Sequence, residues 1–285
     1  MRTNALAIAA VVALAVPTTQ AQVAPNTPPA PTVKEAIYQA SNALGMLRSN
    51  QEVDLLSTVE FWGTGTMTTV AQGGKPGPAF KVTSYHGSMG YDDPPIGGMR
   101  VDVTRTNADG PAQAPQRQIQ AVSGKQAWNE LTPGMNATPA PGAEKDRLLL
   151  LWMTPFGAIK AAAQAAANVK VTIEGGATVL TFPVANLPST APIAGTVLKV
   201  TLNDERLPAK VEARVGDAVV ETDYSGYGDL NDPDFPADIF FPRRFVQKQG
   251  GVSTLDLTIS RTNTYNPYNI FPTPENIRPA AGATP

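Results

Sequence analysis

The sequence contains no cysteine and a single histidine, His86. The absence of cysteine excludes disulfides, a thiol nucleophile, thiolate metal sites and the lipidated cysteine of bacterial lipoproteins. One histidine without any cysteine also excludes a zinc or iron site built from His and Cys ligands. We therefore expect a fold held together by its core, with no metal ion and no cofactor.

Charged side chains are also scarce, at 16% of residues, and they are nearly balanced between 22 basic and 24 acidic ones. Nucleic acids and anionic membrane surfaces attract strongly basic proteins, so this balance argues against either partner. The 24 glycines and 27 prolines are typical of many short strands joined by turns. Neither a P-loop nor a dinucleotide-binding glycine motif is present.

Long hydrophobic runs are absent, but the first 21 residues have the features of a secretory signal peptide. Arg2 supplies a positive charge, Ala5–Val16 is apolar, and the small residues Thr19 and Ala21 precede the expected cleavage site. The apolar run is well short of the roughly 20 residues that a bilayer requires. We expect cleavage near Ala21, export to the periplasm and a mature protein without a membrane span.

The remaining chain divides into three parts. Residues 22–31 are rich in proline and alanine and are predicted to be a flexible linker. Residues 32–271 show no break in composition and no repeat, so we expect a single domain. Residues 272–285 are predicted to be a disordered tail.

A helix is predicted to begin after Thr32. Thr32 and Glu35 have the spacing of a capping box, in which each side chain accepts a hydrogen bond from a backbone N–H of the first turn. Apolar residues then recur at helical spacing, at positions 33, 37, 40, 44 and 47. This amphipathic helix must pack on another element, and a sheet follows it.

The sheet is predicted from alternating polar and apolar runs separated by turn residues. Gly175-Gly176 and Gly250-Gly251 are the clearest two-residue hairpin turns. The predicted strands are residues 59–70, 79–88, 98–107, 116–122, 126–131, 169–174, 177–184, 196–202, 209–215, 219–227, 241–249 and 252–262.

A helical pair interrupts the strands in mid-chain. Glu144–Met153 is apolar on nearly every side, and Thr154-Pro155 caps a second short helix that extends to Ala167. A helix that is apolar all round must be enclosed. The pattern therefore predicts a mainly β (α+β) fold: a strongly curved antiparallel meander or half-open barrel of about 11–12 strands, with the N-terminal helix and the helical pair on its concave face.

The apolar side of residues 59–70 carries two glycines, Gly63 and Gly65, between Phe61 and Met67. Glycine weakens a strand and often marks the close approach of another backbone or of a ligand. Packing of the first helix at these glycines is the simpler interpretation, and a ligand is the alternative. Arg105 follows Met99, Val101 and Val103 at two-residue spacing, so it falls on the apolar face of its predicted strand. A buried arginine needs polar partners. Arg105 therefore either reaches water at the strand end or makes polar contacts inside a cavity.

Three polar groupings have a possible chemistry. His86 and Ser88 lie two residues apart, so their side chains face the same way, but they lack the nucleophile-elbow motif of serine hydrolases. The acidic loop Asp229–Asp238 is rich in oxygen ligands but departs from the EF-hand order, so a stiffened, solvated turn is the simpler interpretation than a calcium site. Aromatic residues gather at positions 224, 227, 235, 240, 241 and 245, either as core or as the rim of a binding pocket.

Four segments resemble the C-terminal half of the periplasmic lipoprotein-carrier superfamily, which includes LolA, LolB and RseB. They are residues 196–203, 207–214, 221–227 (Glu-Thr-Asp-Tyr-Ser-Gly-Tyr) and 241–244 (Phe-Pro-Arg-Arg). The capped first helix and the long strand after it also resemble the opening of these proteins. The resemblance implies an open β-barrel with helices as a lid over an apolar cavity for acyl chains or a lipid-bearing partner.

The leading hypothesis is a monomeric, periplasmic, non-enzymatic binding protein whose concave sheet holds an apolar small molecule or a lipidated protein. Burial of an acyl chain contributes about 0.8 kcal/mol per methylene, so an apolar cavity alone can retain one. The alternatives are an exported structural or protein-interaction module with a filled core and, third, a hydrolase that uses His86. The candidate ligand-binding residues are Phe61, Gly63, Gly65, Met67, Leu149, Trp152, Phe156, Tyr224 and Phe241.

Overall fold

The computed structural model describes residues 29–47, 56–71, 74–95, 97–109, 113–215, 218–234, 237–264 and 266–278. The predicted signal peptide 1–21 and most of the predicted linker 22–31 lie outside these residues. Among the described residues, none of the helices has both the length and the apolar content needed to cross a membrane.

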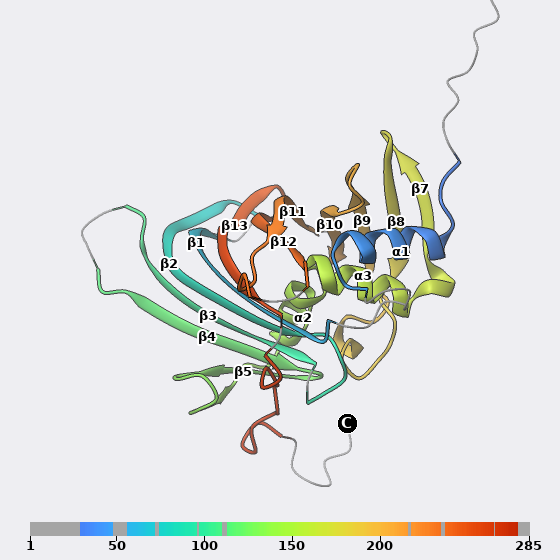
Figure 1. The fold of residues 1–285 in the computed structure, drawn as a ribbon. Helices are drawn as coiled ribbons and strands as arrows, with labels where there is room; N and C mark the ends of the chain where they lie inside the picture. The colour runs from blue at the N-terminus through green and yellow to red at the C-terminus, as the bar shows by residue number, and fades with distance from the viewer. Residues whose placement is uncertain are drawn as a thin grey trace, which may run out of the picture.

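Within these residues, one antiparallel sheet of 13 strands forms the body of the structure (Figure 1). It contains the twelve predicted strands and a short additional one, β6. The strands are β1 Thr58–Val70, β2 Pro76–Gly90, β3 Gly98–Asn107, β4 Gln116–Ser123, β5 Gln126–Glu130, β6 Thr138–Pro139, β7 Lys170–Glu174, β8 Ala177–Pro183, β9 Val197–Leu202, β10 Pro208–Val215, β11 Ala218–Asp229, β12 Phe240–Gln249 and β13 Val252–Asn263.

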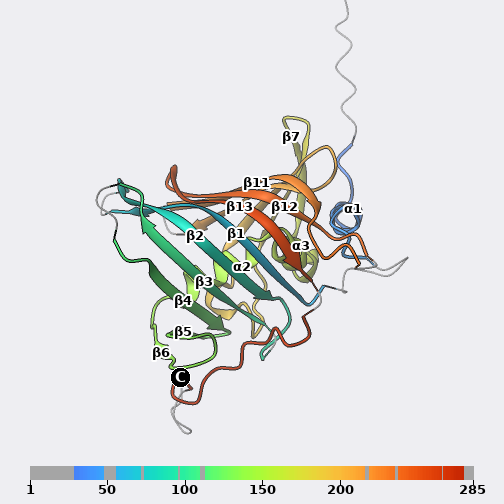
Figure 2. The ribbon, with the colours of Figure 1, turned by 60° about the vertical axis from the view of Figure 1, so that its left-hand side comes forward.

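The sheet consists of two meanders joined through the first and last strands. Its order is β6-β5-β4-β3-β2-β1-β13-β12-β11-β10-β9-β8-β7, so β1 pairs with β13 at the centre. The hydrogen-bonded order of the described strands begins at β6 and ends at β7, which means that the sheet is open. Figures 1 and 2 show that it curves strongly around the helices, as predicted.

The described part of the chain has three helices beside the sheet: α1 Val33–Ala43, α2 Glu144–Trp152 and α3 Pro155–Gln164, with single 3-10 turns at Ala166–Asn168 and Ala191–Ile193. The predicted capping box is present, since Thr32 Oγ1 accepts from the Glu35 backbone and Glu35 Oε2 accepts from Thr32 N. Helix α2 contacts β3, β4 and β5, whereas α3 contacts α1 and β10. The apolar side chains of α2 are enclosed, as expected: Leu148, Leu149, Leu151 and Trp152 are buried.

The pairing of β1 is irregular where it passes Gly63 and Gly65. The pairing register of β1 shifts on both sides of this segment, against β13 and against β2. Bulges of this kind bend a strand and increase its twist. A Cβ atom at Gly63 or Gly65 would collide with the backbone of β13 at Thr258 or Asp256. The expectation that the first helix packs at these glycines is therefore wrong: their close neighbour is the adjacent strand.

The segment after β13 crosses the outer face of the sheet (Figure 2). The Phe271 side chain is fully buried and Phe271 N donates to Pro95 O, while Ile277 packs with Ala121 and Trp128 in a small second core. Residues 272–278, assigned from the sequence to a disordered tail, thus have defined contacts, because two apolar side chains anchor them. Residues 279–285 lie outside the described part of the chain.

Candidate functional site

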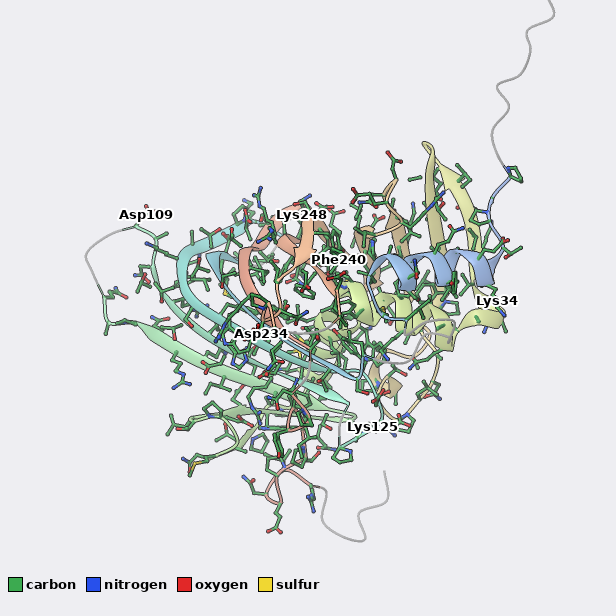
Figure 3. All side chains as sticks on the ribbon, in the orientation of Figure 1. Lys34, Asp109, Lys125, Asp234, Phe240 and Lys248 are labelled. Atoms are coloured by element: carbon green, nitrogen blue, oxygen red, sulfur yellow. The ribbon has the colours of Figure 1, made fainter. Side chains whose placement is uncertain are left out.

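Aromatic side chains fill the space between α3 and the middle of the concave face. Figure 3 shows the described side chains on the ribbon. The ring centroid of Phe61 lies 5.2 Å from Phe241 and 5.8 Å from Tyr85, and Phe156 on α3 lies 5.6 Å from Phe241. The side chains of Phe61, Phe156 and Phe241 are each no more than 1% exposed. These three candidate binding residues do come together, and in this structure they pack against one another.

The junction between α2 and α3 is tied to the sheet by tyrosine hydroxyls. Tyr224 donates a hydrogen bond of 2.6 Å to Met153 O, and the hydroxyls of Tyr91 and Thr154 lie 2.9 Å apart. Burial raises the pKa of Tyr224 and Tyr91 well above the ordinary range, so both remain protonated. The candidate residue Tyr224 therefore holds the helical pair in place from β11.

Two buried donors close to this junction have no protein acceptor among the described residues: the Tyr85 hydroxyl and the Trp152 indole N–H. Trp152, another candidate residue, is fully buried, and its ring lies edge-on to Tyr91 at 6.1 Å. An unpaired buried donor costs about 1–3 kcal/mol. The core is thus well packed but not fully satisfied in its hydrogen bonding.

Met67 lies further along β1, where the strand leaves the aromatic core. Its side chain is half-buried, and its sulfur lies 3.4 Å from Nη1 of Arg105. The Arg105 guanidinium lies over the Phe80 ring, 4.1 Å from the centroid. Arg105 is therefore held by a ring and a thioether near the strand end.

A pocket of about 340 Å³ remains on the concave side between α2 and strands β4, β11, β12 and β13. Leu149 is the one candidate residue in its wall, beside Leu150 and Val220. Its other lining residues, which the sequence reasoning missed, are Gln120, Ala143, Asp146, Arg147, Gln247, Gln249 and Thr254. A signal for two of them was present, since Gln247 and Gln249 continue the two-residue spacing of the inward-facing Phe245.

Arg147 fastens α2 to the edge of the pocket. Its Nη1 donates to the carbonyl oxygens of Ala121 and Trp128 at 2.8 and 2.5 Å, and its Nη2 donates to Asn129 Oδ1 at 2.7 Å. The side chain is 7% exposed, and this burial lowers the pKa of the guanidinium. The wall of the pocket formed by α2 is therefore anchored to β4 and β5.

The single histidine belongs to a polar cluster on the opposite, outer face. His86 Nε2 lies 3.1 Å from Glu60 Oε1 and 3.3 Å from Ser88 Oγ. A Ser-His-acid triad requires the serine and the acid at different ring nitrogens, whereas both contacts here converge on Nε2. The hydrogen bond from His86 and, after it, that from Asn266 hold the pKa of Glu60 below its ordinary value despite burial. The geometry is that of a structural cluster.

Trp62 extends this cluster across three strands. Its register partners are His86 on β2, stacked at 4.4 Å between ring centroids, and Arg261 on β13, whose Cζ lies 4.0 Å from the ring centroid. Trp62 and Arg261 line an outer pocket of about 720 Å³ that is closed on one side by Asp229–Pro233. Within the described residues, no group of three or more His, Asp or Glu side chains is placed to hold a metal ion.

No family model and no curated protein matches the sequence. Among solved structures, a LolA superfamily protein from Nitrosomonas europaea is similar at 11% identity and a TM-score of 0.43, covering 83% of this chain and 95% of that one. LprF from Mycobacterium bovis is similar at 12% identity and a TM-score of 0.28, covering 84% and 99%. Both similarities extend over most of this chain.

Proposed function

We propose that the protein is an exported, non-enzymatic binding protein that holds the apolar part of an amphiphilic ligand, such as a lipid, an acyl chain or a lipidated partner. The pocket between α2 and the concave face carries this proposal. Its volume of about 340 Å³ lies within the roughly 300–1,000 Å³ of small-molecule sites, which combine apolar walls with a few polar groups.

The physical basis is the burial of hydrocarbon against Leu149, Leu150 and Val220. Ten buried methylenes would contribute roughly 8 kcal/mol. That gain is comparable to the cost of association, which is about 4–15 kcal/mol. At the lower end of that cost, a surplus of about 4 kcal/mol remains for reversible binding. The proposal therefore needs only a pocket that shields part of one chain, without a deep cavity through the aromatic core.

Native mass spectrometry and solvent extraction of the purified protein test this proposal, with Leu150→Glu as the variant and Leu131→Glu as its matched control. Leu150 is half-buried in the pocket wall, whereas Leu131 is 74% exposed. We expect a bound amphiphile that is lost in the first variant and retained in the second, with both variants folded by circular dichroism. Equal retention in both, or no amphiphile bound under any loading condition, would contradict the proposal.

A protein-interaction module is the second candidate, and two observations favour it. Phe61, Phe156 and Phe241 fill the middle of the concave face. Leu131 and Met135, 74% and 60% exposed, lie in the segment that leads from β5 to the sheet-edge strand β6. Capture of a stable protein partner that is lost on Met135→Asp, together with no bound amphiphile, would support this alternative.

A further inference from the structure

The polar part of the α2 pocket indicates which head group its ligand carries. On the basis of the proposed function, we infer that the ligand is an uncharged amphiphile, whose carbonyl or hydroxyl groups bind the glutamine side chains of the sheet, and that anionic amphiphiles are disfavoured. The inference rests on the hydrogen-bonding capacity and the charges of the pocket wall.

Glutamine side chains supply that hydrogen-bonding capacity. Gln120 on β4 and Gln247 and Gln249 on β12 line the pocket opposite α2. Within the described part of the chain, the Gln120 and Gln249 amides make no hydrogen bond to another protein group, and Gln247 Oε1 has only a long contact of 3.5 Å from Thr254 Oγ1. A carboxamide both donates and accepts. Three such groups match an ester, an amide or a polyol.

The cation in the pocket wall is already engaged. The Nη atoms of Arg147 donate to three acceptors on β4 and β5, and the side chain is 7% exposed. An anionic head group would have to displace these contacts to reach the guanidinium. Arg105 shares the inward parity of β3, but it lies against Phe80 and Met67 and does not line this pocket.

The exposed charge in the pocket wall is negative. Asp146 lines the pocket and is exposed, and Glu144 lies in the same first turn of α2. Lys145 and Arg147 balance these two carboxylates in number. Lys145 does not line the pocket, however, and Arg147 is buried, so an anion in the pocket meets the exposed carboxylate of Asp146. A neutral head group avoids this repulsion and can still use the glutamines.

Two probes with the same twelve-carbon chain test the inference: 1-monolauroylglycerol, which is uncharged, and laurate, which is anionic. Their dissociation constants are measured by calorimetry at pH 8, below the aggregation threshold of each probe. One unit of like charge at close range in water changes affinity on the order of fivefold, so we expect monolauroylglycerol to bind about fivefold more tightly than laurate.

Two variants assign the effect to its residues. Asp146→Asn should tighten laurate binding and leave monolauroylglycerol unchanged, whereas Asp232→Asn on the outer face should change neither. Gln247→Leu should weaken monolauroylglycerol on the order of fivefold, the effect of about one hydrogen bond. If laurate binds as tightly as the neutral probe, or if Asp146→Asn leaves the ratio unchanged, the inference is wrong while the proposed function stands. If neither probe binds, both fail.

Discussion

Replacing Arg147 by methionine tests how α2 is held over the concave face. The guanidinium donates three hydrogen bonds, two of them to the carbonyls of Ala121 and Trp128. Each hydrogen bond from a charged group contributes roughly 1.5–3 kcal/mol, but the variant no longer buries a charge. The net loss should therefore be about 3 kcal/mol, which for a domain of this size lowers Tm by roughly 6–12 °C.

Arg244→Met is the matched control. Arg244 is a second arginine that donates several hydrogen bonds, in its case two to the Asp256 carboxylate at 2.9 and 2.7 Å. Unlike Arg147, it has a side chain that is 56% exposed. An exposed ion pair contributes about 1 kcal/mol or less. Urea unfolding followed by circular dichroism measures both variants, and hydrogen exchange of residues 144–152 shows whether α2 has loosened. Equal losses in the two variants, or unchanged exchange in α2 of the Arg147 variant, would refute the reasoning.

Three further predictions concern the sheet. Gly65→Ala should destabilise the protein by more than about 2 kcal/mol in urea unfolding, since the new methyl group meets the backbone of β13. The hydrogen bond from His86 is the first cause of the lowered pKa of Glu60. This lowered pKa stabilises the fold above about pH 4.5, and the stabilisation is lost as the pH falls through the folded-state pKa. The free energy of unfolding, measured against pH, should therefore fall less steeply in acid for Glu60→Gln than for the unchanged protein. Phe271→Ala should cost about 3–5 kcal/mol by calorimetry, whereas Tyr268→Ala, at a position 86% exposed, should change stability by less than about 0.5 kcal/mol.

Strand positions were predictable because their signals are local. Gly175-Gly176 and Gly250-Gly251 adopt positive φ at all four residues, which a two-residue turn of this kind needs. The period-two alternation also identified the inward face, since Leu255, Leu257 and Ile259 are all buried. The added strand β6 has two residues, too few for any alternation to be visible.

The candidate site was predicted less well, for a physical reason. The two-residue alternation along a strand indicates which side chains face inward. It does not indicate whether side chains of other elements reach them. Phe61 meets Phe156 and Phe241 in the core through packing across large sequence separations. Leu149 on α2, by contrast, lines the pocket. Whether an inward-facing apolar residue packs or binds depends on the volume that its distant neighbours leave free.

The sequence by itself determined the period of each strand, the turns, the capped first helix and the enclosure of α2, because each depends on neighbours within a few residues. Only the tertiary structure decided that β1 pairs with β13, that β13 occupies the space beside Gly63 and Gly65, and that glutamines face α2 across a pocket. These features depend on contacts between residues far apart in the chain, and such contacts are set by how all the strands curve and pack together.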